Sequence, residues 1–296
     1  MEYLNMEKVD RRSKIRIIID KIAKWITFFA TLFGVTMLTI LIIRIISQGI
    51  HVIDFEFLTN RLSTDPEKAG IMGAILGTLW LIAVVAPVTM FFGMFTAIYI
   101  ELYMKDGKMK SILSTNIANL AGVPSIVYGI LGLTVFVRGM ELGNVVLAGG
   151  LTLSLLILPI TIVTTQEALR AIPSDLTEAA FGIGATKWQA IRTVVLPMAL
   201  PTILTGFILA MSRAIGETAP LVVIGIPTLL IPFPGSIFDK FTVLPMQIYY
   251  WTLDSVLVAE YASLAAGTII VLLFILLVLN LTAVLIRRKF EKKLLR

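Results

Sequence analysis

Long apolar stretches separated by short polar ones run the length of the chain. Hydrophobic residues make up 57% of the sequence and charged residues 15%, whereas soluble domains average about 25% charged residues. A helix needs about 20 apolar residues to cross the roughly 30 Å of bilayer hydrocarbon. Six stretches meet this length, and they lie at residues 23–46, 72–101, 115–137, 143–166, 199–226 and 262–286.

This pattern predicts an all-α polytopic membrane protein with about six transmembrane helices. Only helices and closed barrels satisfy their backbone hydrogen bonds in lipid, and the chain lacks the period-two alternation of barrel strands. The second and fifth stretches are longer than a straight span requires, so we expect these two helices to be tilted or kinked.

Basic residues are distributed unequally between the two sides of these spans. They gather at residues 8–24 and 287–296, beside the first and last spans, and again at 105–110 and 170–192. The remaining connections contain only Arg61, Lys68, Arg138 and Lys240. Because basic residues mark the cytoplasmic side, both termini are predicted to be cytoplasmic. The net charge of +6 is therefore a topology signal, and we expect no nucleic-acid partner.

The sequence lacks the residues of several common catalytic and metal sites. It contains no cysteine, and His51 is its single histidine, which excludes thiolate metal sites and paired-histidine metal motifs. It also lacks the G-x-x-x-x-G-K-[ST] phosphate-binding loop. We therefore expect no catalysis, metal site or bound cofactor in this chain alone.

The polar connection at residues 167–197 is predicted to fold as two short helices joined by a turn. Asp175 with Glu178 has the spacing of a capping box, and so has Thr186 with Gln189. We expect each pair to start one of the helices.

Glycine and proline are expected to end these two helices. Gly182 and Gly184 supply backbone freedom after the first helix, and Pro197 blocks continuation of the second. The spacing resembles the EAA loop of ABC-importer permeases, which reads Glu-Ala-Ala, three residues, Gly, nine residues, Ile, one residue, Leu-Pro. The matching positions are Glu178, Ala179, Ala180, Gly184, Leu196 and Pro197. Val194 replaces the family's isoleucine. The resemblance implies a type I ABC-importer permease fold and a loop that docks a cytoplasmic ATPase, and an inert connection is the alternative.

Two ionisable residues, Arg213 and Glu217, lie within the fifth span. They are four residues apart, so a helix would place them on one face about 6 Å apart along its axis. Gly216 and Pro220 loosen the helix there. A guanidinium matches phosphate or sulfate oxygens, and Glu217 can position Arg213 or accept a hydrogen bond from a protonated phosphate. On the residues alone, a structural ion pair explains them equally well.

Two runs of sequence resemble the PstA family of phosphate-specific ABC-importer permeases. They are Arg213-Ala214-Ile215-Gly216-Glu217-Thr218-Ala219-Pro220 and Ala121-Gly122-Val123-Pro124-Ser125-Ile126-Val127-Tyr128-Gly129. The resemblance covers most of the chain from about Ile71 and implies that Arg213 and Glu217 lie on the phosphate pathway. Ser125 and Tyr128 share a helix face, where they either donate hydrogen bonds to the anion or, as we favour, pack spans together.

The resemblance implies a permease subunit of an ATP-driven phosphate importer in a prokaryotic plasma membrane. Its implied partners are a second permease, two ATPase subunits that bind ATP and Mg²⁺, and an extracytoplasmic phosphate-binding protein. The alternatives are a permease for sulfate, molybdate or phosphonate, a gradient-driven anion transporter, and a non-transporting scaffold.

Three segments are expected along the chain. Residues 1–70 contain the basic N-terminus, the first span and an external loop, residues 71–286 form the permease core, and residues 287–296 form a basic cytoplasmic tail. A second external segment, residues 227–261, contains prolines that exclude one continuous helix, and Tyr249, Tyr250 and Trp251 are expected at headgroup level.

Overall fold

The computed structural model describes residues 6–227 and 233–294. Within these residues the secondary structure is helical, apart from an isolated antiparallel bridge between Val145 and Lys240. Five helices are long and apolar enough to cross a membrane, and a bent pair makes a sixth crossing if its arms are taken as one span. The predicted all-α polytopic fold is confirmed.

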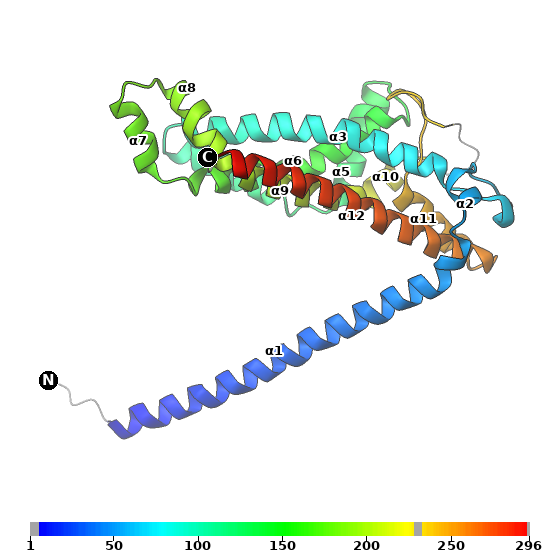
Figure 1. The fold of residues 1–296 in the computed structure, drawn as a ribbon, viewed down its shortest axis with the longest axis horizontal. Coiled ribbons are helices and arrows are strands. Elements are labelled where there is room, and N and C mark those ends of the chain that lie inside the picture. The colour runs from blue at the N-terminus through cyan, green and yellow to red at the C-terminus, as the bar shows by residue number, and fades with distance from the viewer. Residues whose placement is uncertain (1–5, 228–232, 295–296) are drawn as a thin grey trace. The chain divides into compact units, whose positions relative to one another are not determined.

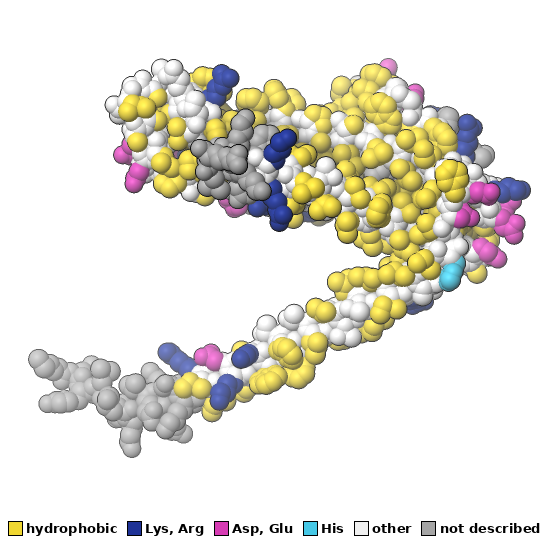
Figure 2. All heavy atoms as spheres, viewed as in Figure 1, with side chains coloured by type: hydrophobic (Ala, Val, Ile, Leu, Met, Phe, Trp, Pro, Cys, Tyr) yellow, Lys and Arg dark blue, Asp and Glu magenta, His cyan; other side chains and the backbone are white. Residues whose placement is uncertain are grey.

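The chain divides into two compact units, residues 1–48 and 49–296. Helix α1 (Met6–Gly49) makes up the described part of the first unit. The most apolar stretch of the helical segment Arg16–Val52 has no buried residue. Hydrophobic side chains cover α1 in Figure 2. A helix that is apolar on all sides is stable only in lipid or against other helices, so α1 has the properties of a membrane span.

Four long helices build the second unit, and their bounds are α3 (Met72–Ile98), α6 (Val146–Arg170), α9 (Leu196–Gly216) and α12 (Glu260–Leu294). Helix α6 is the most buried of them; it packs against α3 and α9, and α12 packs against α9 (Figure 1). Small residues permit this close packing, since a Cβ on Gly150 would lie 2.5 Å from Cγ1 of Val84.

Shorter elements connect these helices and close the two ends of the bundle. They are η1 (Ile50–Val52), α2 (Phe55–Thr59), η2 (Pro66–Lys68), η3 (Tyr99–Tyr103), α4 (Lys108–Leu120), α5 (Ser125–Gly132), η4 (Leu133–Gly139), α7 (Ser174–Gly182), α8 (Lys187–Ala190), η5 (Ile191–Val195), α10 (Ala219–Ile224) and α11 (Leu244–Asp254). We call the end that carries α7 and α8 the loop end, and the end that carries α2 and α11 the far end (Figure 1).

The third expected span, residues 115–137, is not a straight helix. Two helical arms, Lys108–Leu120 and Ser125–Gly139, meet at an angle of 97°. Pro124 causes the bend, because it has no N–H to donate and adopts extended backbone angles of φ −55° and ψ 137°.

The fifth expected span, residues 199–226, also differs from a single helix. Helix α9 ends at Gly216, Glu217 is extended with ψ 122°, and a new helix, α10, starts at Ala219. The predicted loosening at Gly216 and Pro220 is therefore a complete break in the helix.

The far end has a hydrophobic core of its own. Trp251 of α11 is buried there, and its ring stacks on Tyr261 with a centroid separation of 6.3 Å. Its indole fills this core, whereas Tyr249 is exposed. The position of both residues at headgroup level stays a prediction. Phe57 of α2 belongs to the same core, so the loop after α1 packs with the bundle.

Candidate functional site

The EAA-like loop, residues 167–197, lies at the loop end and contains the last turn of α6 followed by helix α7. Helix α7 begins at Ser174, directly after Pro173. The predicted capping box of Asp175 and Glu178 does not form, because the helix starts before Asp175 and places that residue in its first turn. In the first turn the Asp175 carboxylate still interacts favourably with the positive end of the helix dipole.

Gly184 ends α7 with a left-handed backbone, φ +88°. The N–H of Ala185 donates to the carbonyl of Ala180 at 3.0 Å, and the N–H of Gly184 donates to Phe181 at 2.9 Å. This closure requires a residue that adopts positive φ without strain, which is the physical reason for glycine at this position of the motif.

The second capping box is confirmed. The backbone N–H of Thr186 donates to Oε1 of Gln189 at 2.8 Å, and Thr186 Oγ1 accepts from the N–H of Gln189 at 3.4 Å. Helix α8 starts here, as the spacing predicted.

The prediction that Pro197 ends this helix is wrong. Helices α8, η5 and α9 form one continuous span from Lys187 to Gly216. The wider turn of η5 precedes the proline, and the N–H of Leu196 donates to the carbonyl of Ile191, five residues back. Such a π-turn changes the local pairing and lets the helix pass a residue that cannot donate.

The surface of the EAA-like loop is unusually apolar for a polar connection. Phe181, Ile183 and Trp188 are all exposed, and Ile183 has 89% of its surface accessible. Ala179 is exposed as well, whereas Ala180 is buried under the turn and acts in packing. Large apolar side chains exposed together in one short segment are typical of a protein-docking surface.

Two contacts fix this loop to η3, the last turn of the α3 helix. Arg170, at the end of α6, donates from Nε and Nη2 to the two carboxylate oxygens of Glu101, both at 2.9 Å. Nζ of Lys187 lies 4.8 Å from the ring centroid of Tyr103. The loop is thus held through a bidentate ion pair and a cation–π contact.

Lys110 of α4 joins the same cluster of charges. Its Nζ lies 3.6 Å from Oε1 of Glu101 and 2.9 Å from Oδ1 of Asp106. The hydrogen bond from Lys110 lowers the pKa of Asp106 below its ordinary value. Glu101 is therefore shared by α6 and α4, which joins three helices at the loop end.

Arg213 and Glu217 lie at the break between α9 and α10. Nε of Arg213 is 3.6 Å from Oε1 of Glu217, and the Arg213 side chain keeps 51% of its surface accessible. A Cβ added to Gly216 would meet no atom within 4 Å. The pair is loose, and the backbone beside it opens onto free space.

The two runs that carry the PstA-like sequence meet in space. Helix α10 packs against α5, and a Cβ on Gly129 would lie 2.8 Å from Cα of Pro220. Tyr128 is buried and donates to the carbonyl of Leu120 at 2.8 Å, so its hydroxyl spans the bend between α4 and α5. Ser125 is half-buried at the start of α5.

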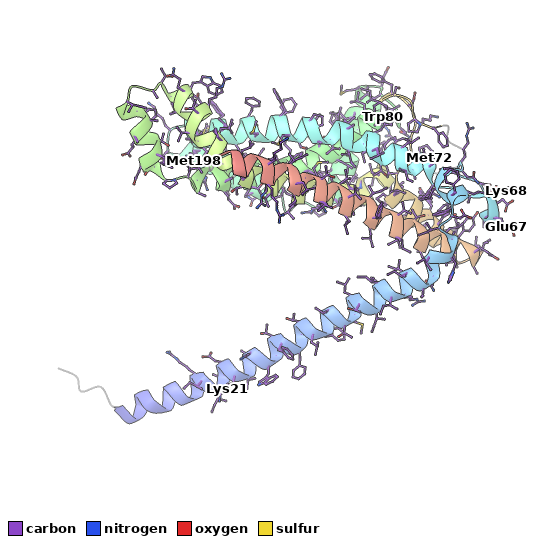
Figure 3. The ribbon with its side chains drawn as sticks, in the orientation of Figure 1. Lys21, Glu67, Lys68, Met72, Trp80 and Met198 are labelled. Carbon is purple, nitrogen blue, oxygen red and sulfur yellow. The ribbon has the colours of Figure 1, made fainter. Side chains whose placement is uncertain are left out.

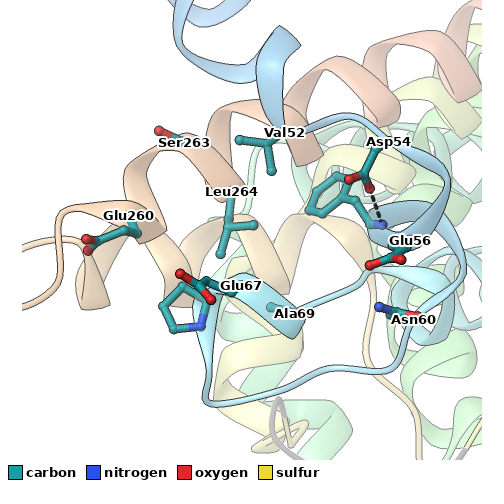
Figure 4. A pocket seen from close by; sticks show the side chains of 11 residues that line it. Val52, Asp54, Glu56, Asn60, Glu67, Ala69, Glu260, Ser263 and Leu264 are labelled. Atoms are coloured by element: carbon teal, nitrogen blue, oxygen red, sulfur yellow. Dashed lines mark hydrogen bonds between the residues drawn. The ribbon is translucent and has the colours of Figure 1, made fainter.

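The far end has a cavity of about 340 Å³. Acidic side chains line much of it, as Figure 4 shows for Asp54, Glu56, Glu67 and Glu260. Asp54 is already engaged, because it accepts from the N–H of Phe57 at 2.6 Å. Among the described residues, no three His, Asp or Glu side chains are arranged to hold a metal ion.

Further residues fix the ends of the bundle. Trp80 donates from Nε1 to the carbonyl of Pro234 at 3.0 Å and so ties α3 to the segment before α11; Figure 3 labels Trp80, and Met198 near the loop end.

Glu101 and Tyr103 were missed by sequence reasoning. Their one local signal is a carboxylate at the end of an overlong apolar stretch.

Comparison with known proteins identifies relatives of the whole chain. The "Probable ABC transporter permease protein YqgI" of Bacillus subtilis is 29% identical over 94% of this chain and 98% of its own length. The "Phosphate transport system permease protein PstA 1" of Mycobacterium tuberculosis is 31% identical over 88% of this chain and 86% of its own.

Solved structures share the fold. A chain of a bacterial ABC transporter that imports alginate has a TM-score of 0.64 at 17% identity, and the match covers 93% of this chain and 99% of that chain. A chain of the MetNI methionine ABC transporter has a TM-score of 0.59 at 18% identity, covering 77% and 99%.

A family model gives the most direct assignment. Residues 89–295 match the family described as "Binding-protein-dependent transport system inner membrane component". This match takes in the EAA-like loop and the break at Glu217, and it confirms the predicted permease family. The chain belongs to the family of inner membrane components of binding-protein-dependent transport systems.

Proposed function

We propose that this chain is the transmembrane permease subunit of an ATP-driven importer of inorganic phosphate. The observation that carries the proposal is the contact of the two PstA-like runs around a broken helix that presents Arg213 and Glu217. Relatives named as phosphate transport permeases, at 31% identity over 88% of this chain, support the same substrate.

The chemistry of the break suits a phosphate ion. Arg213 is half-exposed and only loosely paired, so its guanidinium can turn to two oxygens of an anion. Glu217 can accept a hydrogen bond from the proton of HPO₄²⁻. Sulfate has no such proton, so the same carboxylate would repel it.

The EAA-like loop supplies the connection to an energy source. Its exposed Phe181, Ile183 and Trp188 form the surface on which a cytoplasmic ATPase subunit would dock. The bound ATP and Mg²⁺ belong to that partner, and this chain contributes no catalytic group.

The full transporter contains this chain, a second permease, two ATPase subunits and an extracytoplasmic phosphate-binding protein. The loop end and both termini face the cytoplasm, in line with the basic residues that flank the first and last spans. The far end then faces outward, where the binding protein delivers its ligand.

The test is uptake of labelled phosphate into vesicles that contain the whole complex. We expect uptake that requires ATP, resists excess unlabelled sulfate and is lost in Arg213→Ala. Lys240→Ala, an exposed basic residue at the far end, is the matched control and should retain uptake. Uptake without ATP would refute an ABC importer, and inhibition by sulfate would reassign the cargo to another oxyanion.

A further inference from the structure

An apolar groove of about 250 Å³ lies between α9 and α12, with α3 beside it. Its lining includes Phe207, Met211 and Ile215 from α9 and Leu279, Ala283 and Ile286 from α12. An apolar cavity of this kind does not hold ordered water, so in a bilayer it is filled by an apolar group.

Two hydrogen bonds join the helices that form this groove. Ser212 donates to Oδ1 of Asn280 at 2.7 Å, and Nη1 of Arg287 donates to Oγ1 of Thr205 at 2.8 Å. The two bonds are seven residues apart on each helix, or about 10 Å along the axis. Arg287 is not part of the lining, but it follows the lining residue Ile286 and bonds to Thr205, which follows the lining residue Leu204. It therefore lies at the margin of the groove nearest the loop end.

Arg287 is incompletely satisfied at the end of the groove. Its Nε is buried and has no hydrogen-bond partner among the described residues. Its one hydrogen bond within that part of the chain goes to the neutral hydroxyl of Thr205. A partly buried guanidinium is costly unless an anion pairs with it.

We propose that this groove binds an anionic phospholipid, with an acyl chain along α9 and α12 and the headgroup phosphate on Arg287. Basic pockets between transmembrane helices bind anionic headgroups, and a guanidinium fork matches a phosphate. The charge of Arg287 and the apolar lining beside it complement the two parts of such a lipid.

The dimensions of the groove favour a lipid over a protein helix. One helical turn, about 10 Å across and about 5.4 Å long, fills about 400 Å³, which is more than the 250 Å³ of the groove. A free phosphate ion would share the contact with Arg287 but would gain nothing from the lining, because its polar members, Ser212 and Asn280, bond to each other.

The test measures phospholipid retained by the purified whole complex. The complex is reconstituted with phosphatidylglycerol and phosphatidylcholine, extracted in detergent, and its bound lipid is counted by native mass spectrometry. We expect Arg287→Gln to weaken retention of phosphatidylglycerol about tenfold, the loss of one charge-assisted interaction. The matched control is Arg288→Gln, which removes the same charge from an exposed neighbour and should retain the lipid.

Two further arms separate the possible occupants. Ala283→Trp fills the groove and should reduce retention of both lipids, and excess inorganic phosphate should displace neither. Equal losses in Arg287→Gln and Arg288→Gln would overturn the proposal in favour of unspecific charge attraction. Displacement by inorganic phosphate, or the absence of retained lipid in the unmodified complex, would also overturn it.

Discussion

Two Arg–Glu pairs in this protein differ in their geometry, although their arginines are equally exposed. Arg170 and Glu101 come from different helices, pair through two hydrogen bonds of 2.9 Å, and leave Glu101 with 12% of its side chain accessible. Arg213 and Glu217 come from one broken helix, approach only to 3.6 Å and leave Glu217 with 20% of its side chain accessible. The two arginines are alike in exposure, with 52% of Arg170 and 51% of Arg213 accessible. A closed bidentate pair fixes helices together, whereas an open pair keeps a charge free for a ligand.

The substitution with the largest expected effect breaks the open pair. Arg213→Ala should lower phosphate uptake about a hundredfold, because two charge-assisted hydrogen bonds to the anion are lost. Thermal unfolding of the complex should be unchanged, since the pair is loose and exposed. Initial uptake rates and a melting curve measure the two effects. A large fall in stability would instead indicate a structural ion pair.

The next substitution breaks the closed pair. Glu101→Gln leaves Arg170 without its carboxylate and Lys110 with Asp106 alone, and should lower uptake about tenfold by loosening the loop from α3. Charge reversal of both partners, Glu101→Arg with Arg170→Glu, should restore part of the uptake. Asp106→Asn is the control, because Asp106 also bonds Lys110 but is exposed. Equal effects at Glu101 and Asp106 would contradict the anchoring role.

A smaller effect is expected where the two PstA-like runs meet. Gly129→Ala brings a Cβ to 2.8 Å from Cα of Pro220, so α5 and α10 must separate. Overpacking of this kind costs about 1–3 kcal/mol and should raise the phosphate concentration needed for half-maximal uptake. Gly34→Ala is the control, because a Cβ there meets no atom within 4 Å. Unchanged uptake kinetics in Gly129→Ala would show that the contact does not set the site.

The smallest expected effect concerns the turn of the EAA-like loop. Gly184→Ala places a side chain at φ +88° and should cost about 1–2 kcal/mol of local stability. We expect the substitution to weaken binding of the ATPase subunit, and a pull-down titration measures this binding. Gly182→Ala, in the helix and without a neighbour within 4 Å, should bind as well as the unmodified chain.

Local sequence patterns predicted the elements better than their contacts. The apolar stretches gave the spans, and Thr186 with Gln189 gave the start of α8. Pro173 moved the start of α7 ahead of Asp175, and the turn of η5 carried a helix past Pro197. In both cases a rule for one residue failed because neighbouring residues changed the local backbone: Pro173 came before the expected cap, and the π-turn of η5 came before the proline.

The candidate site was only partly readable from the sequence. Arg213 and Glu217 stood out because charges within apolar stretches are rare. The pairing of Glu101 with Arg170 joins residues far apart in the chain, and no local spacing predicts such a partner. The contact of Gly129 with Pro220 was equally hidden, because it depends on the 97° bend after α4 and the break after α9.

The passage of the helix through Pro197 has a mechanical consequence. Lys187 in the EAA-like loop and Arg213 belong to one uninterrupted rod, Lys187–Gly216. At 1.5 Å per residue the rod is about 45 Å long, so it acts as a lever arm between the two ends. A rotation of about 10° at its base would swing the guanidinium by about 7 Å. Torque applied at the loop would thus reach Arg213 along one continuous helix.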